Sequence, residues 1–429
     1  MYHPILRAGA QRELKKIGQA DLVIGLPTYK NPQPAAHVAQ IALAGAREHY
    51  PHLRTVLVNA DAGYAAETRR AIKSQLPPDQ PNLFVVSGRY EGVLGYGNSV
   101  AAILDAALAL DAKAIVLLDS NTATITPSWI AGLAELLLED KADLVLPRYK
   151  WAMDDPASML NDLISYPLFR ALWGRSVRYP GAPDFALSAH IAAEILDQDV
   201  WETEVSNFAF TPWLTSYATL EGWRVGQSAL GEKRLGSSEN DNAAQQQERF
   251  AAIFHDMLSI MFRFVYEYRH VWVDVDKFYS QSTLTRYRSA VQADPTPERD
   301  CTDLLDALAL GWIDYRHLWK RVLTPDNLTL LEALAALPPD RFYFPADLWA
   351  RIIYDFAVVF NKGECDPYQV VKSLFPIYQG RLAAFWQEVA GLSLAGREGT
   401  IAAQAVEFEE IRAYLRIRWY MYQPWPYNK

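Results

Sequence analysis

The chain has 429 residues, 50% of them hydrophobic and 21% charged, which is enough for two or three domains with sizeable cores. Its formal net charge of −9 argues against a nucleic-acid-binding protein, which normally carries a basic face. The two cysteines, Cys301 and Cys365, indicate neither a disulfide framework nor a zinc module and are typical of a reducing cytoplasm. We find no apolar run near the roughly 18 residues of a membrane span and no signal-peptide core, so we expect a cytoplasmic protein.

Strand-like runs alternate with helical stretches over the first 235 residues. Strands are predicted at 20–29 (ADLVIGLPTY), 54–61 (RTVLVNAD), 82–88 (NLFVVSG), 112–120 (AKAIVLLDS) and 142–149 (ADLVLPRY), with helices at 35–48, 64–75 and 98–110 between them. This alternation predicts an α/β domain whose parallel or mixed sheet has helices on both faces. Ligands bind such sheets at the carboxyl ends of the strands, and Tyr29, Asp61 and Asp119 fall at such ends.

The composition changes after the strand-rich region. The polar stretch 231–249 (GEKRLGSSENDNAAQQQER) predicts a loop or linker. Apolar residues then recur at helical spacing over 250–265, 302–322, 327–337, 346–361, 367–390 and 400–420. We therefore predict two domains, 1–235 and an all-helical 236–429. We expect the aromatic helices of the second domain to close the acceptor side of a site and to offer a homodimer surface.

A glycine-rich turn, EGVLGYGNS, follows the third predicted strand and precedes a helix. Its Gly92, Gly95 and Gly97 can bring backbone amides close to a phosphate, or they can simply form a tight turn that needs positive φ. The order of the glycines differs from the G-x-G-x-x-G of dinucleotide folds, which disfavours an oxidoreductase. Asp61 can accept hydrogen bonds from a base or ribose, or it can cap the next helix.

Asp119, in LLDSN, is the most promising carboxylate, because it ends the fourth predicted strand. It can contact a sugar or ribose hydroxyl, or it can be an aspartate at a strand end with no ligand. The absence of G-x-S-x-G, of G-K-[ST] and of a Cys/His cluster with zinc spacing disfavours hydrolase, P-loop and zinc classes.

Two further segments hold charged candidates. RSVRYPGAPDFALS places Arg175, Arg178 and Asp184 in a proline-broken loop, where arginines suit a phosphate or carboxylate acceptor. Lys233 and Arg234 lie at the start of the predicted linker and can meet a diphosphate. A solvated loop and a solvated basic turn are the alternatives for these two segments.

The ordered set IGLPTYKN … VNADAG … GVLGYGNSV … VLLDSNTATITPSWI … YPLFRALWGRSVRYPGAPDFALS … LEGWRVGQSALGEK resembles family-2-like GT-A glycosyltransferases. It is most similar to the group of mannosylglycerate synthase and glucosyl-3-phosphoglycerate synthase, over about residues 20–235. The resemblance implies a GT-A-like fold and retaining transfer of a sugar from a nucleoside-diphosphate sugar to a small, glycerate-like hydroxyl acceptor.

The resemblance also implies roles for the candidate residues. Asp119 and Asp184 would be catalytic, with Asp184 and Arg178 on the acceptor side. The donor would be bound by Pro27, Tyr29, Asp61, Gly95, Gly97, Asn121, Lys233 and Arg234. A Mg²⁺ or Mn²⁺ ion, if one binds, would be held by Asp119.

Four polar positions depart from the pattern of the group. The usual Asp-x-Asp reads Asp119-Ser120-Asn121, a lysine of the glycine turn is replaced by Tyr96, and a carboxylate is missing around Phe210-Thr211-Pro212. The metal-binding histidine is replaced by Glu232-Lys233-Arg234. Two accounts fit: a lysine takes over the charge of the metal in an active enzyme, or the chain is a catalytically silent homologue that acts as a binding or scaffold protein.

Overall fold

The computed structural model describes residues 3–151, 155–236, 243–274, 285–286 and 295–423. The described residues fall into two compact units. The first comprises those within Met1–Ser158, Val177–Asp256 and Ser282–Ser289, and the second those within Met159–Ser176, Met257–Gln281 and Ala290–Lys429. This division differs from the predicted boundary at residue 235, because Met159–Ser176 belongs to the second unit and a helix from Ala243 continues past the boundary at Asp256.

The predicted linker is wrong at both of its ends. Its first residues, Gly231 to Lys233, complete a strand, and residues 243–249 start a helix. The run AAQQQER consists of good helix formers, so its polarity reflects a solvated helix face and not a loop. Residues 237–242 of the predicted linker lie outside the described residues.

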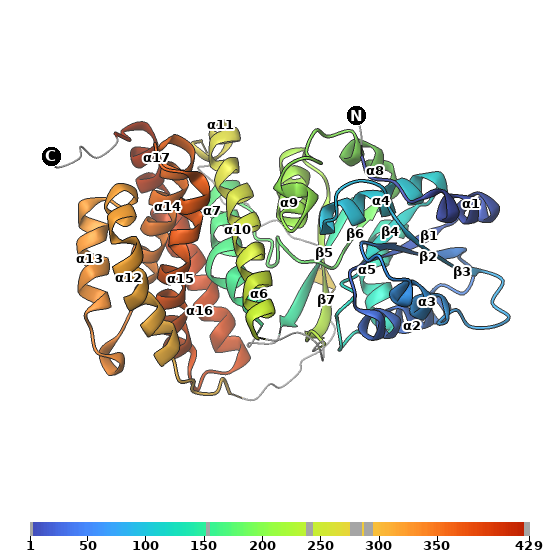
Figure 1. The fold of residues 1–429 in the computed structure, drawn as a ribbon, viewed down its shortest axis with the longest axis horizontal. Coiled ribbons are helices and arrows are strands. Elements are labelled where there is room, and N and C mark those ends of the chain that lie inside the picture. Colours follow the sequence, from blue (N-terminus) through green and yellow to red (C-terminus); the bar gives the residue numbers. More distant parts are fainter. Residues whose placement is uncertain (1–2, 152–154, 237–242, 275–284, 287–294, 424–429) are drawn as a thin grey trace. The chain divides into compact units, whose positions relative to one another are not determined.

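The first unit is built around a sheet with the strand order β3-β2-β1-β4-β6-β5-β7-β8 (Figure 1). Its strands are β1 (Leu22–Thr28), β2 (Thr55–Asp61), β3 (Leu83–Arg89), β4 (Ala114–Leu117), β5 (Leu144–Trp151), β6 (Phe185–Ser188), β7 (Val225–Lys233) and β8 (Thr285–Arg286). Its helices are α1 (Ala8–Ile17), α2 (Pro32–His49), α3 (Glu67–Lys73), α4 (Tyr96–Ala109), α5 (Ser128–Leu138), α8 (Ala189–Leu196), η2 (Glu204–Ser206) and α9 (Phe210–Leu220). Two more, α6 (Pro156–Leu160) and α10 (Ala243–Glu267), cross the boundary between the units.

The sheet is mixed. Strands β1, β2, β3 and β4 are parallel, whereas β6 is antiparallel to both β4 and β5, and β5 is parallel to β7. The strands β1, β2 and β4 are buried along their whole length and read as continuous apolar runs, as expected for a sheet covered on both faces. Because β6 runs against β4, the amino end of β6 lies beside the carboxyl end of β4.

Helices cover both faces of this sheet (Figure 1). Leu22, Ile24 and Leu26 of β1 pack into one core with α2 and α5. On the other face, Gly25 leaves room for Ile103 of α4: an added Cβ would lie 2.6 Å from the Ile103 side chain. The predicted α/β class, with a mixed sheet and helices on both faces, is confirmed.

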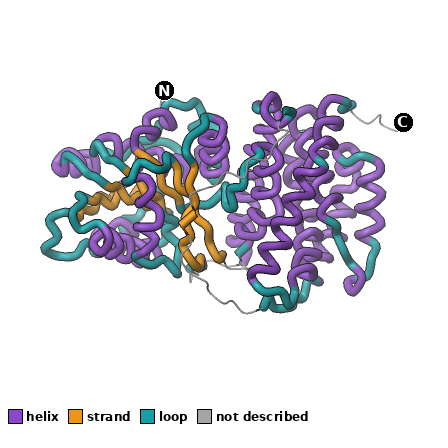
Figure 2. The backbone as a smooth tube through the Cα atoms, turned by 180° about the vertical axis from the view of Figure 1, so that it is seen from behind, coloured by secondary structure: helices purple, strands orange, loops and turns teal. Residues whose placement is uncertain are grey.

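The described residues of the second unit form helices and loops (Figure 2). The helices are η1 (Asn161–Ser165), α7 (Tyr166–Trp173), α11 (Arg269–Trp272), α12 (Thr302–Val322), α13 (Pro325–Ala335), η3 (Pro339–Arg341), α14 (Ala346–Lys362), α15 (Pro367–Val389), α16 (Leu394–Glu410) and α17 (Arg412–Tyr420), with the end of α10. The helices predicted beyond residue 250 are present, although the one predicted at 400–420 is divided near Ile411. The predicted all-helical range 236–429 also contains β8, which pairs with β7 in the sheet of the first unit because the chain returns there between helices of the second unit. In the described part of the chain, no helix is long and apolar enough to cross a membrane.

Candidate functional site

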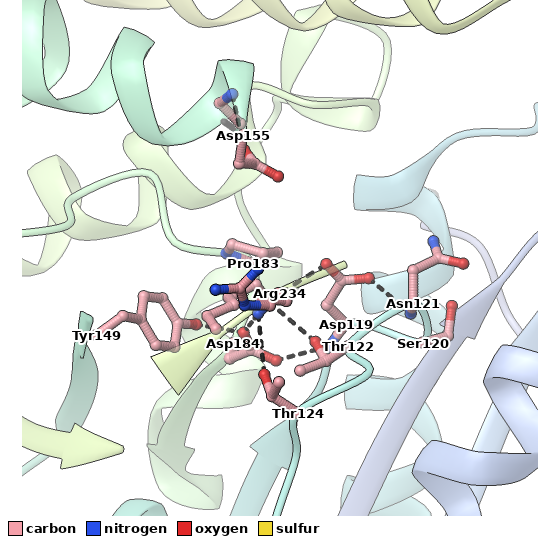
Figure 3. Close-up of polar contacts among 12 residues, drawn as sticks. Asp119, Ser120, Asn121, Thr122, Thr124, Tyr149, Asp155, Pro183, Asp184 and Arg234 are labelled. Atoms are coloured by element: carbon pink, nitrogen blue, oxygen red, sulfur yellow. Dashed lines mark hydrogen bonds and ion pairs between the residues drawn. The ribbon is translucent and has the colours of Figure 1, made fainter. Parts of the chain in front are cut away.

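Two of the candidate carboxylates meet where β4 ends and β6 begins. Leu117, the last residue of β4, pairs with Phe185, the first residue of β6. Asp119 and Asp184 flank this pair, and the backbone N–H of Asp119 donates to Asp184 Oδ1 at 2.8 Å (Figure 3). The antiparallel strand therefore brings together two aspartates that lie 65 residues apart in the chain.

Lys233, the last residue of β7, joins both carboxylates. Its ammonium forms an ion pair with Asp184 and a second one, at 3.3 Å, with Asp119 Oδ2, and it donates to Thr122 Oγ1 at 3.1 Å. A lysine ammonium has three protons to donate, and these three acceptors account for them. The side chains of Lys233 and Asp184 are 0% exposed, whereas that of Asp119 is 14% exposed. Asp119 is thus the member of the cluster that reaches solvent.

Aromatic side chains enclose the buried part of this cluster. Tyr149 of β5 donates its hydroxyl to Asp184 Oδ2, and its ring centroid lies 5.2 Å from the Lys233 ammonium. Trp129 and Tyr179 pack against Tyr149, with ring centroids 5.7 and 5.4 Å away. An apolar surround of this kind strengthens the interactions between the charges inside it.

The charges shift one another's pKa values in directions that follow from burial and pairing. Burial raises the pKa of Asp119, but the charge of Lys233, the N–H of Asn121 and the charge of Arg249 outweigh it and lower the pKa. Burial dominates at Asp184, where the pKa is raised in spite of Lys233. The pKa of Lys233 is raised, because the attraction of both aspartates exceeds the cost of its burial.

The loop after Asp119 is held by its own hydrogen bonds. The Asn121 N–H donates to Asp119 Oδ1 at 3.0 Å, and Asn31 Nδ2 donates to Asn121 Oδ1 at 2.9 Å and to Ser120 Oγ at 2.8 Å. The side-chain oxygen of Asn121, Oδ1, stands where an Asp-x-Asp would have its second carboxylate. It already accepts a hydrogen bond from Asn31 within the protein.

The residues present do not fit a divalent metal. Within the described ranges, no group of three or more His, Cys, Asp or Glu side chains is placed to hold an ion. Asp119 and Asp184 share the Lys233 ammonium, and the Asn121 amide is engaged by Asn31. Mg²⁺ and Mn²⁺ favour several oxygen ligands, and this cluster offers them a cation instead.

Asp61 is also fully engaged by its own chain. It ends β2, where it accepts from Thr28 Oγ1 at 3.2 Å and from the Gly63 N–H at 2.9 Å and forms an ion pair with Arg69 of α3. With an exposed fraction of 1%, it ties β2 to α3 and has little surface to offer a nucleotide. Its predicted donor contact stays a prediction.

The two candidates in and after β1 differ in exposure. Pro27 is buried within β1, opposite Ala60 of β2, while Tyr29 is 55% exposed just beyond the end of the strand. The Lys30 ammonium lies 5.0 Å from the centroid of the Tyr29 ring. Of the two, Tyr29 has the surface that a stacked base needs.

Packing requires glycine at two positions of the turn, Gly95 and Gly97. An added Cβ would lie 2.3 Å from the Ser206 carbonyl oxygen at Gly95 and 1.9 Å from the Val205 carbonyl oxygen at Gly97. Neither Gly95 nor Gly97 has a φ in the left-handed range, so a tight turn does not require glycine at these two positions. Gly92 does have such a φ, 102°. The predicted contact of this turn with a donor stays a prediction. The contact that the structure shows is with η2, whose Val205 and Ser206 carbonyl oxygens face the two glycines.

The two remaining candidates, Arg178 and Arg234, differ in burial and in their contacts. Arg178 is buried; its N–H donates to Gln227 Oε1 at 2.9 Å, and its guanidinium stacks on the Tyr179 ring with 4.5 Å to the centroid. Arg234 is exposed, and its Nε donates to Glu232 at 2.7 Å. Its backbone N–H donates to Thr124 Oγ1 at 2.9 Å, so it adjoins the loop that carries Asp119.

Three residues that interact with the Asp119, Asp184 and Lys233 side chains were not predicted from the sequence. Tyr149 ends the predicted strand ADLVLPRY, so its position at a strand end was a usable signal. The role of Thr122 could not be predicted from the sequence, because it depends on where the Lys233 ammonium lies. Arg249, exposed on the first turns of α10, influences Asp119 through its charge, but it lies in the stretch predicted as a linker.

Comparisons with known proteins give structural similarities only. No protein-family model matches the sequence, and no curated protein matches it. Glucosyl-3-phosphoglycerate synthase from Mycobacterium tuberculosis, in complex with Mn²⁺, UDP and glucosyl-3-phosphoglycerate, is 16% identical with a TM-score of 0.40, over 60% of this chain and 86% of that chain. The same enzyme with Mn²⁺, UDP-glucose and phosphoglyceric acid is 16% identical with a TM-score of 0.40, over 58% and 83%. With Mn²⁺, UDP-glucose and glycerol 3-phosphate, the values are 15% and 0.39, over 58% and 83%.

Proposed function

We propose that the protein is a glycosyltransferase that moves a sugar from a nucleoside-diphosphate sugar to a small hydroxylated acceptor. The observation that carries the proposal is the cluster of Asp119, Asp184 and Lys233 at the carboxyl edge of the sheet, with Asp119 at its solvent side. Ligands of α/β sheets bind at this edge. The donor class, the glycerate-like acceptor and the retaining outcome rest on the sequence resemblance.

The chemistry requires stabilisation of a departing diphosphate. The bond between the anomeric carbon and the diphosphate oxygen breaks, and the nucleoside diphosphate leaves with the electron pair. The acceptor oxygen bonds to the anomeric carbon and gives up its proton to the departing diphosphate. Asp119 is placed to hold a donor hydroxyl, while Arg234 and Arg249 supply exposed guanidinium groups for the diphosphate charge.

This assignment revises the role of Lys233. Its three protons are already donated to Asp184, Asp119 and Thr122, so a direct contact with the diphosphate would require one of these bonds to break. Lys233 therefore acts on a donor through Asp119, whose position and ionisation it maintains.

Donor binding tests the proposal. UDP-glucose, GDP-mannose and the free nucleotides are each added to the folded protein, and the thermal midpoint is measured. We expect one nucleotide sugar to raise the midpoint and Asp119→Ala to abolish the increase, with Asp326→Ala, an exposed aspartate of the second unit, as the control. Absence of any increase in folded protein contradicts the proposal, and an increase that survives Asp119→Ala contradicts the assigned site.

The second candidate function is a catalytically silent homologue that acts through binding. It is favoured by Asp61 and Lys233, whose polar groups are all engaged within the chain. Donor binding without release of nucleoside diphosphate in the presence of glycerate, 3-phosphoglycerate or glycerol 3-phosphate would favour this candidate.

A further inference from the structure

The buried ammonium of Lys233 lies between the carboxylates of Asp119 and Asp184, where a bridging cation would otherwise be needed. Its Nζ contacts Asp119 Oδ2 at 3.3 Å and pairs with Asp184, and none of its side chain is exposed. Metal–oxygen bonds of Mg²⁺ and Ca²⁺ measure about 2.0–2.6 Å, so an ion bridging both carboxylates would have to displace the ammonium.

The position in the chain strengthens this geometry. Lys233 ends β7, and the segment that follows pairs with the loop after Asp119: Ala123 donates its N–H to the Arg234 carbonyl at 2.8 Å, and Gly236 donates to the Asn121 carbonyl at 2.7 Å. The backbone thus fixes residue 233 against the loop. Whatever side chain stands there is directed at the two aspartates.

We propose that Lys233 is a built-in replacement for a divalent cation and that the wild-type cluster excludes metal. Its occupation of the carboxylate pair is independent of the proposed function, whereas its use in sugar transfer rests on that function. A divalent ion would neutralise two ionised carboxylates, but one ammonium leaves a formal charge of −1. The exposed Arg249, whose charge acts on Asp119, and Arg234, whose backbone adjoins the same loop, then serve as the cations that a diphosphate meets.

Replacing Lys233 by histidine removes the resident charge and adds a neutral nitrogen ligand beside the two carboxylates. Two carboxylates and an imidazole form a ligand set that divalent transition metals accept. The variant should therefore acquire a metal site that the natural chain lacks.

The experiment measures Mn²⁺ binding in the absence of nucleotide, by the paramagnetic resonance signal of the free ion. It compares the wild type, Asp119→Asn, Lys233→His and the double variant Lys233→His/Asp119→Asn. We expect the wild type and Asp119→Asn to bind Mn²⁺ equally weakly. Lys233→His should gain one saturable site with an affinity about tenfold higher or more, and the double variant should lose this site.

Two results would overturn the proposal. One is a wild-type Mn²⁺ site that Asp119→Asn removes, and the other is a folded Lys233→His variant that binds no more Mn²⁺ than the double variant. If Lys233→His does not fold, as judged by circular dichroism, the comparison of wild type with Asp119→Asn still decides. A negative donor-binding result with these metal results unchanged would reject the proposed function and leave the replacement of the metal intact.

The functional arm uses the donor that raises the thermal midpoint. Its affinity for the wild type should be the same in EDTA and in Mn²⁺, because the cluster supplies its own cation. A loss of donor affinity of about tenfold or more in EDTA would overturn the use of Lys233 in place of a metal.

Discussion

Each compact unit buries a carboxylate together with a cation, but the two networks differ in charge balance and in exposure. In the second unit, Asp355 accepts from Arg418 Nε at 2.8 Å, Tyr414 Oη at 2.8 Å, Asn327 Nδ2 at 2.8 Å and the Thr324 N–H at 3.1 Å. One buried acid is matched by one cation and three neutral donors. In the first unit, two acids share one lysine, and Asp119 reaches solvent.

The difference indicates what each network is for. The acceptor contacts of Asp355 join α13, α14 and α17, and its partner Arg418 also donates to the Val322 carbonyl of α12. The acid is fully satisfied, which is the condition under which a buried charge is tolerated. The Asp119 cluster keeps an unbalanced negative charge at the edge of a sheet. The proposed donor site therefore lies at the network whose formal charges do not balance, whereas the balanced network inside the helical bundle is a structural tie.

The largest effect is expected from Asp355→Ala. Removing the acid leaves Arg418 buried without its counter-charge, which should lower the free energy of unfolding by about 3–5 kcal/mol. Denaturant unfolding measures this change. The matched control is Glu332→Ala, which breaks an exposed pair with Arg316 and should cost at most about 1 kcal/mol. Equal effects of the two substitutions would contradict the structural role of Asp355.

Lys233→Met should be the next largest change. It leaves Asp119 and Asp184 facing each other without a cation and should cost about 2–4 kcal/mol at neutral pH. The cost should shrink as the pH falls, because the pKa of Asp184 is raised and its protonation removes the repulsion between the two carboxylates. A cost that stays constant from neutral pH into the acid range would show that the two carboxylates do not interact through Lys233.

One glycine in each unit can be replaced by alanine to test how closely neighbouring atoms surround it. Gly97→Ala places a Cβ 1.9 Å from the Val205 carbonyl oxygen and should cost about 1–3 kcal/mol. Gly399, on the exposed side of α16, has no atom within 4 Å of its added Cβ, so Gly399→Ala should stabilise the helix by up to about 1 kcal/mol. Thermal unfolding with both variants decides whether η2 or a ligand accounts for the glycine at position 97.

Asp119→Asn leaves one acid, Asp184, paired with one cation, Lys233, as Asp355 is paired with Arg418. We expect a loss of about 1 kcal/mol at neutral pH, because the native environment favours ionised Asp119. The pKa of Asp119 is lowered, so its contribution is fully present above the ordinary aspartate value of 3.8 and disappears as the pH falls through the native pKa. Unfolding of both proteins from pH 7 to pH 2 should therefore converge in acid; a difference that grows in acid would reverse the sign.

The smallest effect on stability is expected from Arg234→Gln. Its ion pair with Glu232 is exposed and should contribute at most about 0.5 kcal/mol. Donor affinity should nevertheless fall, since the guanidinium is exposed and the backbone of Arg234 adjoins the loop that carries Asp119. Thermal shift with the bound donor measures this fall, and an unchanged affinity would remove Arg234 from the predicted donor site.

Local patterns in the sequence determined much of the molecule. The runs of Val, Leu and Ile predicted β1 to β5, and helical spacing predicted α12 to α15 within a few residues, because these patterns report which side of an element is buried. The positions of Asp61 and Asp119 at strand ends were predicted for the same reason. The membership of Met159–Ser176 in the second unit was not, since its apolar pattern is compatible with either core.

The partners of those strand-end residues were decided only by the tertiary structure. Lys233 lies 114 residues from Asp119 and 49 from Asp184, and it meets them because the chain that follows β7 pairs with the loop after Asp119. This pairing depends on how whole elements pack, which no local spacing records. The sequence therefore singled out two carboxylates and a lysine but placed only Asp119 at the end of a strand, and only the tertiary structure joined the three into one buried cluster.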